Sequence, residues 1–69
     1  MPRINETTLL GTENNLAEMG FQKTLSQYVN RCYHAEWTKG KRKFTFLQVN
    51  PDNTDTSANN FEVDCNDRS

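Results

Sequence analysis

The side chains best placed to do chemistry form a basic and aromatic run near the middle of the chain. Proteins that bind single-stranded nucleic acid need cations along the phosphate track and flat rings on which bases stack, and this run interleaves both. We call it the basic-aromatic strip, and its members are Trp37, Lys39, Lys41, Arg42, Lys43, Phe44 and Phe46. The strip therefore predicts a nucleic-acid surface as one interpretation.

The same strip also suits binding to another protein. Small interfaces concentrate their binding energy in a few aromatic and arginine side chains. Phe44 and Phe46 can act as apolar anchors, with Arg42 and Trp37 beside them. A third interpretation is purely structural, in which the cations pair with acids of the fold and N-terminal residues cover the phenylalanines.

Catalytic and metal-binding chemistry finds little support in the sequence. Cys32 and His34 are two residues apart, so on a helix they point about 200° apart, and no second pair has the spacing of metal ligands. The same angle separates them as a nucleophile and its base. The segment 53–59 alternates like a calcium loop, but Ala58 stands where such a loop needs glycine. We expect a non-enzymatic protein with no cofactor and no metal.

Size and charge limit the fold and its partners. The 69 residues form one small domain, 1–69, and only 33% of them are hydrophobic, so the core is small. The net charge of −1 hides a basic segment, 23–43, between two acidic ones. Such a segment either pairs within the fold or faces an anionic partner.

Nothing in the sequence suggests export or membrane insertion. The first eleven residues lack the apolar core of a signal peptide, and no stretch reaches the length that spans a bilayer. We therefore expect a soluble, cytoplasmic protein with no membrane partner. The two cysteines are then reduced thiols, although a bond between Cys32 and Cys65 stays open.

The pattern of apolar residues predicts two helices after an arm or short strand at 1–11. Thr12 can cap a short helix over 13–19, which Gly20 ends. A longer helix is predicted from Thr24, where Gln27 completes a capping box, to Thr38. Its apolar residues recur at spacings of three and four, and they are Leu25, Tyr28, Val29, Cys32 and Ala35.

Two strands are predicted at 43–49 and 61–65, joined by a mobile loop at 51–60. Pairing Val49 with Phe61 gives one apolar face, and it turns Phe44 and Phe46 onto the opposite, open face. The predicted fold is α+β: one short and one longer amphipathic helix on a small antiparallel hairpin, with a possible third strand from the N-terminal arm.

The function predicted from these features is that of a small non-enzymatic regulatory or inhibitory protein that binds a larger protein partner. The alternative is a single-stranded nucleic-acid-binding protein that uses the basic-aromatic strip. Self-association is a further possibility, because an isolated hairpin is marginally stable.

Overall fold

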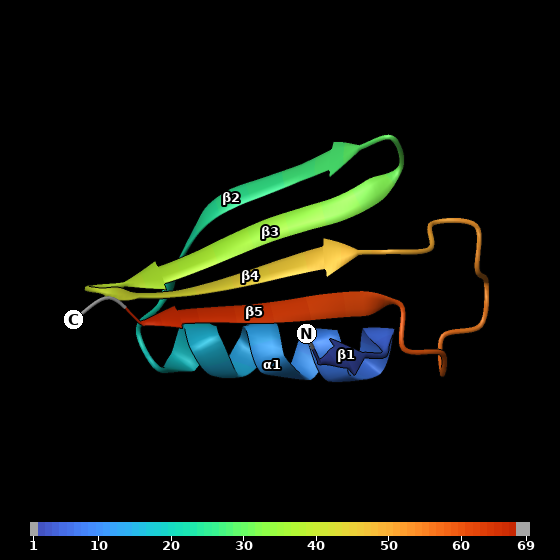
Figure 1. The fold of residues 1–69 in the computed structure, drawn as a ribbon. Helices are drawn as coiled ribbons and strands as arrows, with labels where there is room; N and C mark the ends of the chain where they lie inside the picture. Colours follow the sequence, from blue (N-terminus) through green and yellow to red (C-terminus); the bar gives the residue numbers. More distant parts are fainter. Residues whose placement is uncertain (1, 68–69) are drawn as a thin grey trace.

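A computed structural model describes residues 2–67 and shows a single helix packed on one face of a five-stranded antiparallel sheet (Figure 1). In chain order the elements are β1 (Arg3–Ile4), α1 (Glu6–Glu18), β2 (Gln22–Val29), β3 (Cys32–Lys39), β4 (Arg42–Gln48) and β5 (Phe61–Asp67). The strand order across the sheet is β1-β5-β4-β3-β2. The predicted fold of two helices on a hairpin is therefore wrong.

The largest correction concerns residues 24–38, where β2 and β3 form a hairpin in place of the long helix. Asn30 and Arg31 have φ values of 51° and 66°, the left-handed pair of a type I′ turn, which matches the twist of the flanking strands. The apolar spacing fits a helix, but Tyr33, Ala35 and Trp37 also alternate at the spacing of a strand. Aromatic and β-branched side chains then favour the sheet.

The next turn relies on glycine. Gly40 and Lys41 connect β3 to β4, and Gly40 has a φ of +58° where Lys41 has an ordinary negative value. A single left-handed residue in the first central position marks a type II′ turn, a conformation that glycine adopts without strain. Residues 32–48 thus form a second tight hairpin that follows directly on the first.

The helix begins earlier than the predicted short helix. Asn5 is its N-cap, because the Asn5 side-chain oxygen accepts a hydrogen bond of 2.8 Å from the Thr8 amide. Gly20, with a φ of +92°, follows the helix and turns the chain toward β2. Within the segment expected to be an arm, Arg3 and Ile4 do form a short strand, which pairs with Glu62 and Phe61 of β5.

The core lies between α1 and the sheet. The helix contributes Leu9 and Leu16, and the sheet side contributes Phe21, Ala35, Phe46 and Phe61. The opposite face of the sheet is not covered by any element of residues 2–67 (Figure 1). We call these the covered face and the open face.

The register of β4 against β5 differs by one residue from the predicted one. Phe46 pairs with Val63 and Gln48 with Phe61, in place of Leu47 with Val63 and Val49 with Phe61. A shift of one residue exchanges the two faces of a strand. Phe44 and Phe46 therefore lie on the covered face, and their predicted position on the open face is wrong.

No helix among residues 2–67 is long and apolar enough to cross a bilayer.

Candidate functional site

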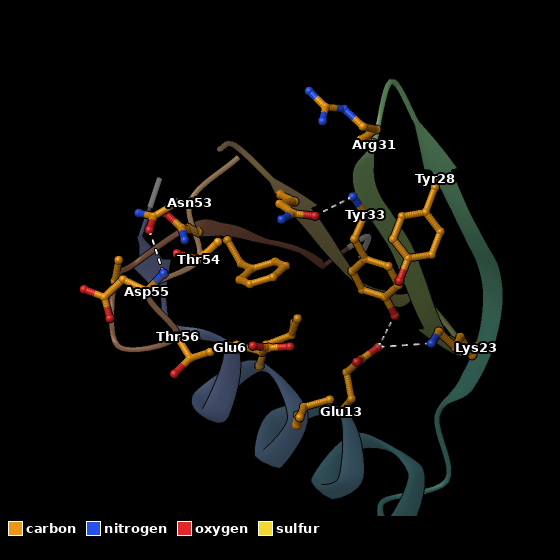
Figure 2. A pocket seen from close by; sticks show the side chains of 16 residues that line it. Glu6, Glu13, Lys23, Tyr28, Arg31, Tyr33, Asn53, Thr54, Asp55 and Thr56 are labelled. Atoms are coloured by element: carbon orange, nitrogen blue, oxygen red, sulfur yellow. Dashed lines mark hydrogen bonds and ion pairs between the residues drawn. The ribbon is translucent and has the colours of Figure 1, made fainter. Parts of the chain in front are cut away.

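A groove of about 740 Å³ lies beside the helix (Figure 2). Its walls come from α1, from the β2–β3 hairpin and from the loop between β4 and β5. Side chains that line it include Glu6, Leu10, Glu13, Lys23, Tyr28, Arg31, Tyr33, Gln48, Asn53, Asp55 and Asn60.

Glu13 forms the polar floor of the groove. This carboxylate is buried, and its Oε2 atom accepts hydrogen bonds from the Tyr33 hydroxyl at 2.9 Å and from Trp37 Nε1 at 2.8 Å. The Lys23 ammonium lies 3.4 Å from the same oxygen (Figure 2). A buried charge is stable only when it is paired and hydrogen-bonded, and these three donors supply both conditions.

Lys23 also lies over two aromatic rings. Its Nζ atom is 5.2 Å from the centre of the Tyr33 ring and 5.7 Å from that of Trp37, within the range of cation–π attraction. Burial lowers the pKa of Lys23, but hydrogen bonding to Tyr33 and the charge of Glu13 outweigh that effect and leave the pKa raised. The ammonium is therefore held in its charged form.

Tyr33 is held in its neutral form by the same contacts. Burial raises the pKa of the Tyr33 hydroxyl, and the neighbouring Glu13 carboxylate raises it further, while Lys23 partly opposes them. Glu13, Lys23 and Tyr33 thus form a hydrogen-bonded cluster in which Lys23 stays charged and Tyr33 stays neutral.

The far wall of the groove is the loop before β5. Within it, Asp55 Oδ1 accepts hydrogen bonds from the Ser57 hydroxyl at 2.7 Å and from its amide at 3.0 Å, which lowers the pKa of Asp55. Asn53 Nδ2 donates to Asn60 Oδ1 at 3.3 Å. These bonds define the shape of the wall, and the mobility of 51–60 stays a prediction.

Two further contacts link the hairpin to the rest of the groove. Arg31 Nη2 lies 2.8 Å from Asp52 Oδ1, so an ion pair connects the β2–β3 turn to the start of the loop. The amide of Tyr33 donates to Gln48 Oε1 at 3.0 Å, which ties β3 to the end of β4.

The rim of the groove is apolar and exposed. Tyr28 is 72% exposed, and its ring centre lies 5.5 Å from that of Tyr33 across the hairpin. Leu10 on the helix is 55% exposed. Leu10 and Tyr28 are the two large hydrophobic side chains lining the groove that are more than half accessible.

The three aromatic side chains of the basic-aromatic strip, Trp37, Phe44 and Phe46, make contacts within the fold. Phe46 is 0% exposed, and Phe44 packs edge-on against Phe21 with ring centres 5.5 Å apart. Trp37 is partly buried beneath Lys23 and bonded to Glu13. Each of these three rings thus has contacts within the chain, with Phe46 buried and Trp37 and Phe44 partly buried.

The structure also divides the cations of the strip between the two faces. Lys39 donates to the Met19 carbonyl, and Lys39 and Arg42 both lie over the Phe21 ring at 5.9 Å on the covered face. Lys43 is on the open face, 3.1 Å from Glu36 Oε1. Lys41 is exposed in the β3–β4 turn. These contacts favour the structural interpretation of the strip, and its binding roles stay predictions.

The cysteines and the histidine do not come together. Cys32 pairs with Val29 on the open face, whereas Cys65 pairs with Phe44 on the covered face of a strand two positions away, and both are free thiols. His34 Nε2 lies 3.6 Å from Glu36. Among the side chains that the structure describes, no group of three or more acidic, cysteine or histidine residues could hold a metal ion.

The cluster of Glu13, Lys23 and Tyr33 was missed from the sequence. A signal existed, because Glu13 stands four residues after Leu9 and three before Leu16, on the apolar stripe of a helix that begins near residue 6. An acid on such a stripe implies buried donors opposite it. The buried position of Glu13 could be predicted only with the helix start placed near residue 6, whereas the helix predicted from the sequence begins at residue 13.

The chain matches no known family model, and it has no significant match among curated proteins or solved structures.

Proposed function

We propose that this chain is a small non-enzymatic regulatory or inhibitory protein that binds a larger protein partner through the groove. The observation that carries the proposal is Tyr28, which is 72% exposed on the rim of a groove whose floor is fixed by buried hydrogen bonds. Tyrosine is enriched at the energetic centres of protein interfaces because it combines a large apolar body with a polar tip.

The charges of the groove support a protein partner over a nucleic acid. Lys23 and Arg31 line it, but so do Glu6, Glu13 and Asp55, and both cations are paired with acids of the same chain. Nucleic-acid binding draws most of its affinity from unpaired cations that meet phosphates. A mixed groove beside exposed apolar side chains is closer to the polar rim and apolar centre of a protein interface.

We place this action in the cytoplasm. A reducing compartment fits Cys32 and Cys65, which lie on different strands and opposite faces of the sheet as free thiols. Trapping of the thiols immediately on cell lysis should find both reduced.

The proposal is tested by comparing Tyr28→Ser with Met19→Ser as tagged full-length proteins. Met19 is 51% exposed just beyond the helix, outside the residues that line the groove, so it is a matched loss of an exposed apolar side chain. We expect the proteins that copurify with the wild type to be lost with Tyr28→Ser and kept with Met19→Ser. Truncating a central aromatic side chain at an interface costs about 2 kcal/mol or more of binding, which is roughly thirtyfold in affinity.

Two outcomes contradict the proposal. In one, the copurifying proteins survive Tyr28→Ser at wild-type levels while circular dichroism shows both variants folded. In the other, they are lost equally with both substitutions. Binding to labelled single-stranded RNA or DNA that falls steeply with salt, and that Lys41→Ala weakens, would favour the nucleic-acid alternative instead.

A further inference from the structure

The two sides of the sheet differ in whether their outer long strand, β5 or β2, pairs with a further strand. The edge of β5 is paired with β1 at Phe61 and Glu62, whereas the outer edge of β2 has no strand against it at any position among residues 2–67 (Figure 1). Natural proteins protect exposed edges with charges, prolines or bulges because such edges pair readily with other strands. The segment 25–29 of β2 has no charge and no proline, and its bulge lies before it, between Lys23 and Leu25.

The backbone groups that face outward on β2 follow from the register. Tyr28 pairs with Tyr33, and the Tyr33 amide donates to Gln48 on the β4 side, so this pair does not exchange backbone hydrogen bonds. In an antiparallel ladder, hydrogen-bonded and non-bonded pairs alternate. The N–H and C=O groups of Tyr28, and of Ser26 two residues earlier, therefore point toward the open edge.

We propose that β2 pairs antiparallel with β2 of a second copy of this chain, with Gln27 opposite Gln27 on a two-fold axis. This register places Ser26 of each copy opposite Tyr28 of the other, so the outward backbone groups bond to one another. It joins the two sheets into one continuous sheet. An interface of this kind is self-complementary, as two-fold symmetry requires.

The side chains fit the same register. Leu25, Gln27 and Val29 alternate onto the open face, so Leu25 of each copy meets the 50% exposed Val29 of the other. On the covered face the small Ser26 meets the large Tyr28. Centring the pair on Ser26 instead would set Leu25 against Gln27 and would draw the ladder into the bulge.

The two cations nearest the pairing segment each have an acidic partner in their own chain. The register brings Lys23 of one copy toward Arg31 of the other, but each cation is paired within its own chain. Lys23 lies 3.4 Å from Glu13, and Arg31 lies 2.8 Å from Asp52. The bulge before Leu25 also ends the regular ladder short of Lys23.

The dimer has a defined geometry. Because the axis is perpendicular to the sheet, both helices lie on the same side, and the two grooves face the same way on either side of the axis. The pairing does not depend on the proposed partner, since it requires only the purified chain.

Sedimentation equilibrium of the full chain over a wide concentration range tests the dimer. We expect the average mass to rise from one chain toward two with concentration. Val29→Lys should weaken association about tenfold or more, because it removes an apolar cross-strand pair on each side of the axis. Leu47→Lys is the matched control, since it makes the same type of change on the open face of an inner strand.

Amide hydrogen exchange gives a second readout that does not rely on variants. The amides of Ser26 and Tyr28 should exchange fast in dilute solution and become protected as concentration rises, whereas those of Leu25, Gln27 and Val29 stay protected throughout. A monomeric mass up to millimolar concentration overturns the proposal. So does equal loss of association in Val29→Lys and Leu47→Lys, or concentration-independent exchange at Ser26 and Tyr28.

Discussion

The two faces of the sheet differ most clearly at neighbouring residues of β4. Phe46 points to the covered face and is 0% exposed, while Leu47 points to the open face and is 40% exposed. Both are large and apolar, so hydrophobicity alone does not decide which is buried. The position of α1 decides it, because the helix covers one face and no element of the described residues covers the other (Figure 1).

The two faces also differ in how their carboxylates are stabilised. On the covered face, Glu13 is buried and gathers Tyr33, Trp37 and Lys23 around one oxygen. On the open face, Glu36 lies between Lys43 and His34 at 3.1 and 3.6 Å with partial access to water. A buried carboxylate depends on its donors, whereas an accessible one can be solvated by water when a partner is lost.

The largest expected difference is between Phe46→Ala and Leu47→Ala. Truncating a fully buried phenylalanine costs about 3–5 kcal/mol of unfolding free energy, against about 1 kcal/mol for a partly exposed leucine. A domain of this size has a total stability on the order of 3–10 kcal/mol, so Phe46→Ala is expected to unfold much of the population. Urea unfolding followed by Trp37 fluorescence measures both. Equal costs would contradict the observed register of β4.

The second comparison sets Glu13→Ala against Glu36→Ala. Removing Glu13 leaves the Tyr33 hydroxyl and Trp37 Nε1 without their acceptor, at a cost of about 3 kcal/mol. Removing Glu36 breaks an accessible ion pair and should cost about 1 kcal/mol or less. Urea unfolding at neutral pH measures the difference. Glu13→Gln, which keeps an acceptor oxygen, should lie between them, and a Glu13→Ala protein as stable as Glu36→Ala would refute the role of the buried cluster.

The difference between the two faces also explains which features of β4 and β5 could be predicted from the sequence. The strands at 43–49 and 61–65 were predicted within two residues, because aromatic and β-branched runs favour strands wherever they pack. The buried face of 61–65 was also predicted correctly, because Phe61 and Val63 alternate with acids and pack in or against the core. The buried face of 43–49 was not, since residues 44, 46, 47 and 49 are all apolar and give no alternation to fix the register.

The prediction of a helix at 24–38, where the structure has a hairpin, failed for a related reason. Leu25, Val29 and Cys32 recur at helical spacing, yet all three lie on the open face of β2 and β3. The deciding residues were Asn30 and Arg31, whose left-handed conformations make a two-residue turn. Asparagine favours that conformation but arginine does not, so the turn lacks the Asn-Gly pattern that identifies such hairpins. The candidate site depends on this hairpin and could not be predicted without it.

A smaller effect is expected at alkaline pH and only on the covered face. The raised pKa values of Tyr33 and Lys23 mean that folding favours the protonated forms of both groups. Their contribution is complete below the unfolded values of 10.0 and 10.5, and it is lost as pH rises through the folded values. Unfolding free energy should therefore fall above about pH 10. Tyr33→Phe should flatten this decline, and an unchanged slope would argue against the coupling of Tyr33 to Glu13.

The most direct test of the proposed function is photo-crosslinking from the two faces. A benzoylphenylalanine at position 28 stands on the rim of the groove, and the same residue at position 47 stands on the open face. We expect position 28 to capture a larger protein, apart from any adduct of twice the chain mass, and position 47 to capture none. Adducts with a larger protein from position 47 alone would show that the open face, and not the groove, binds the partner.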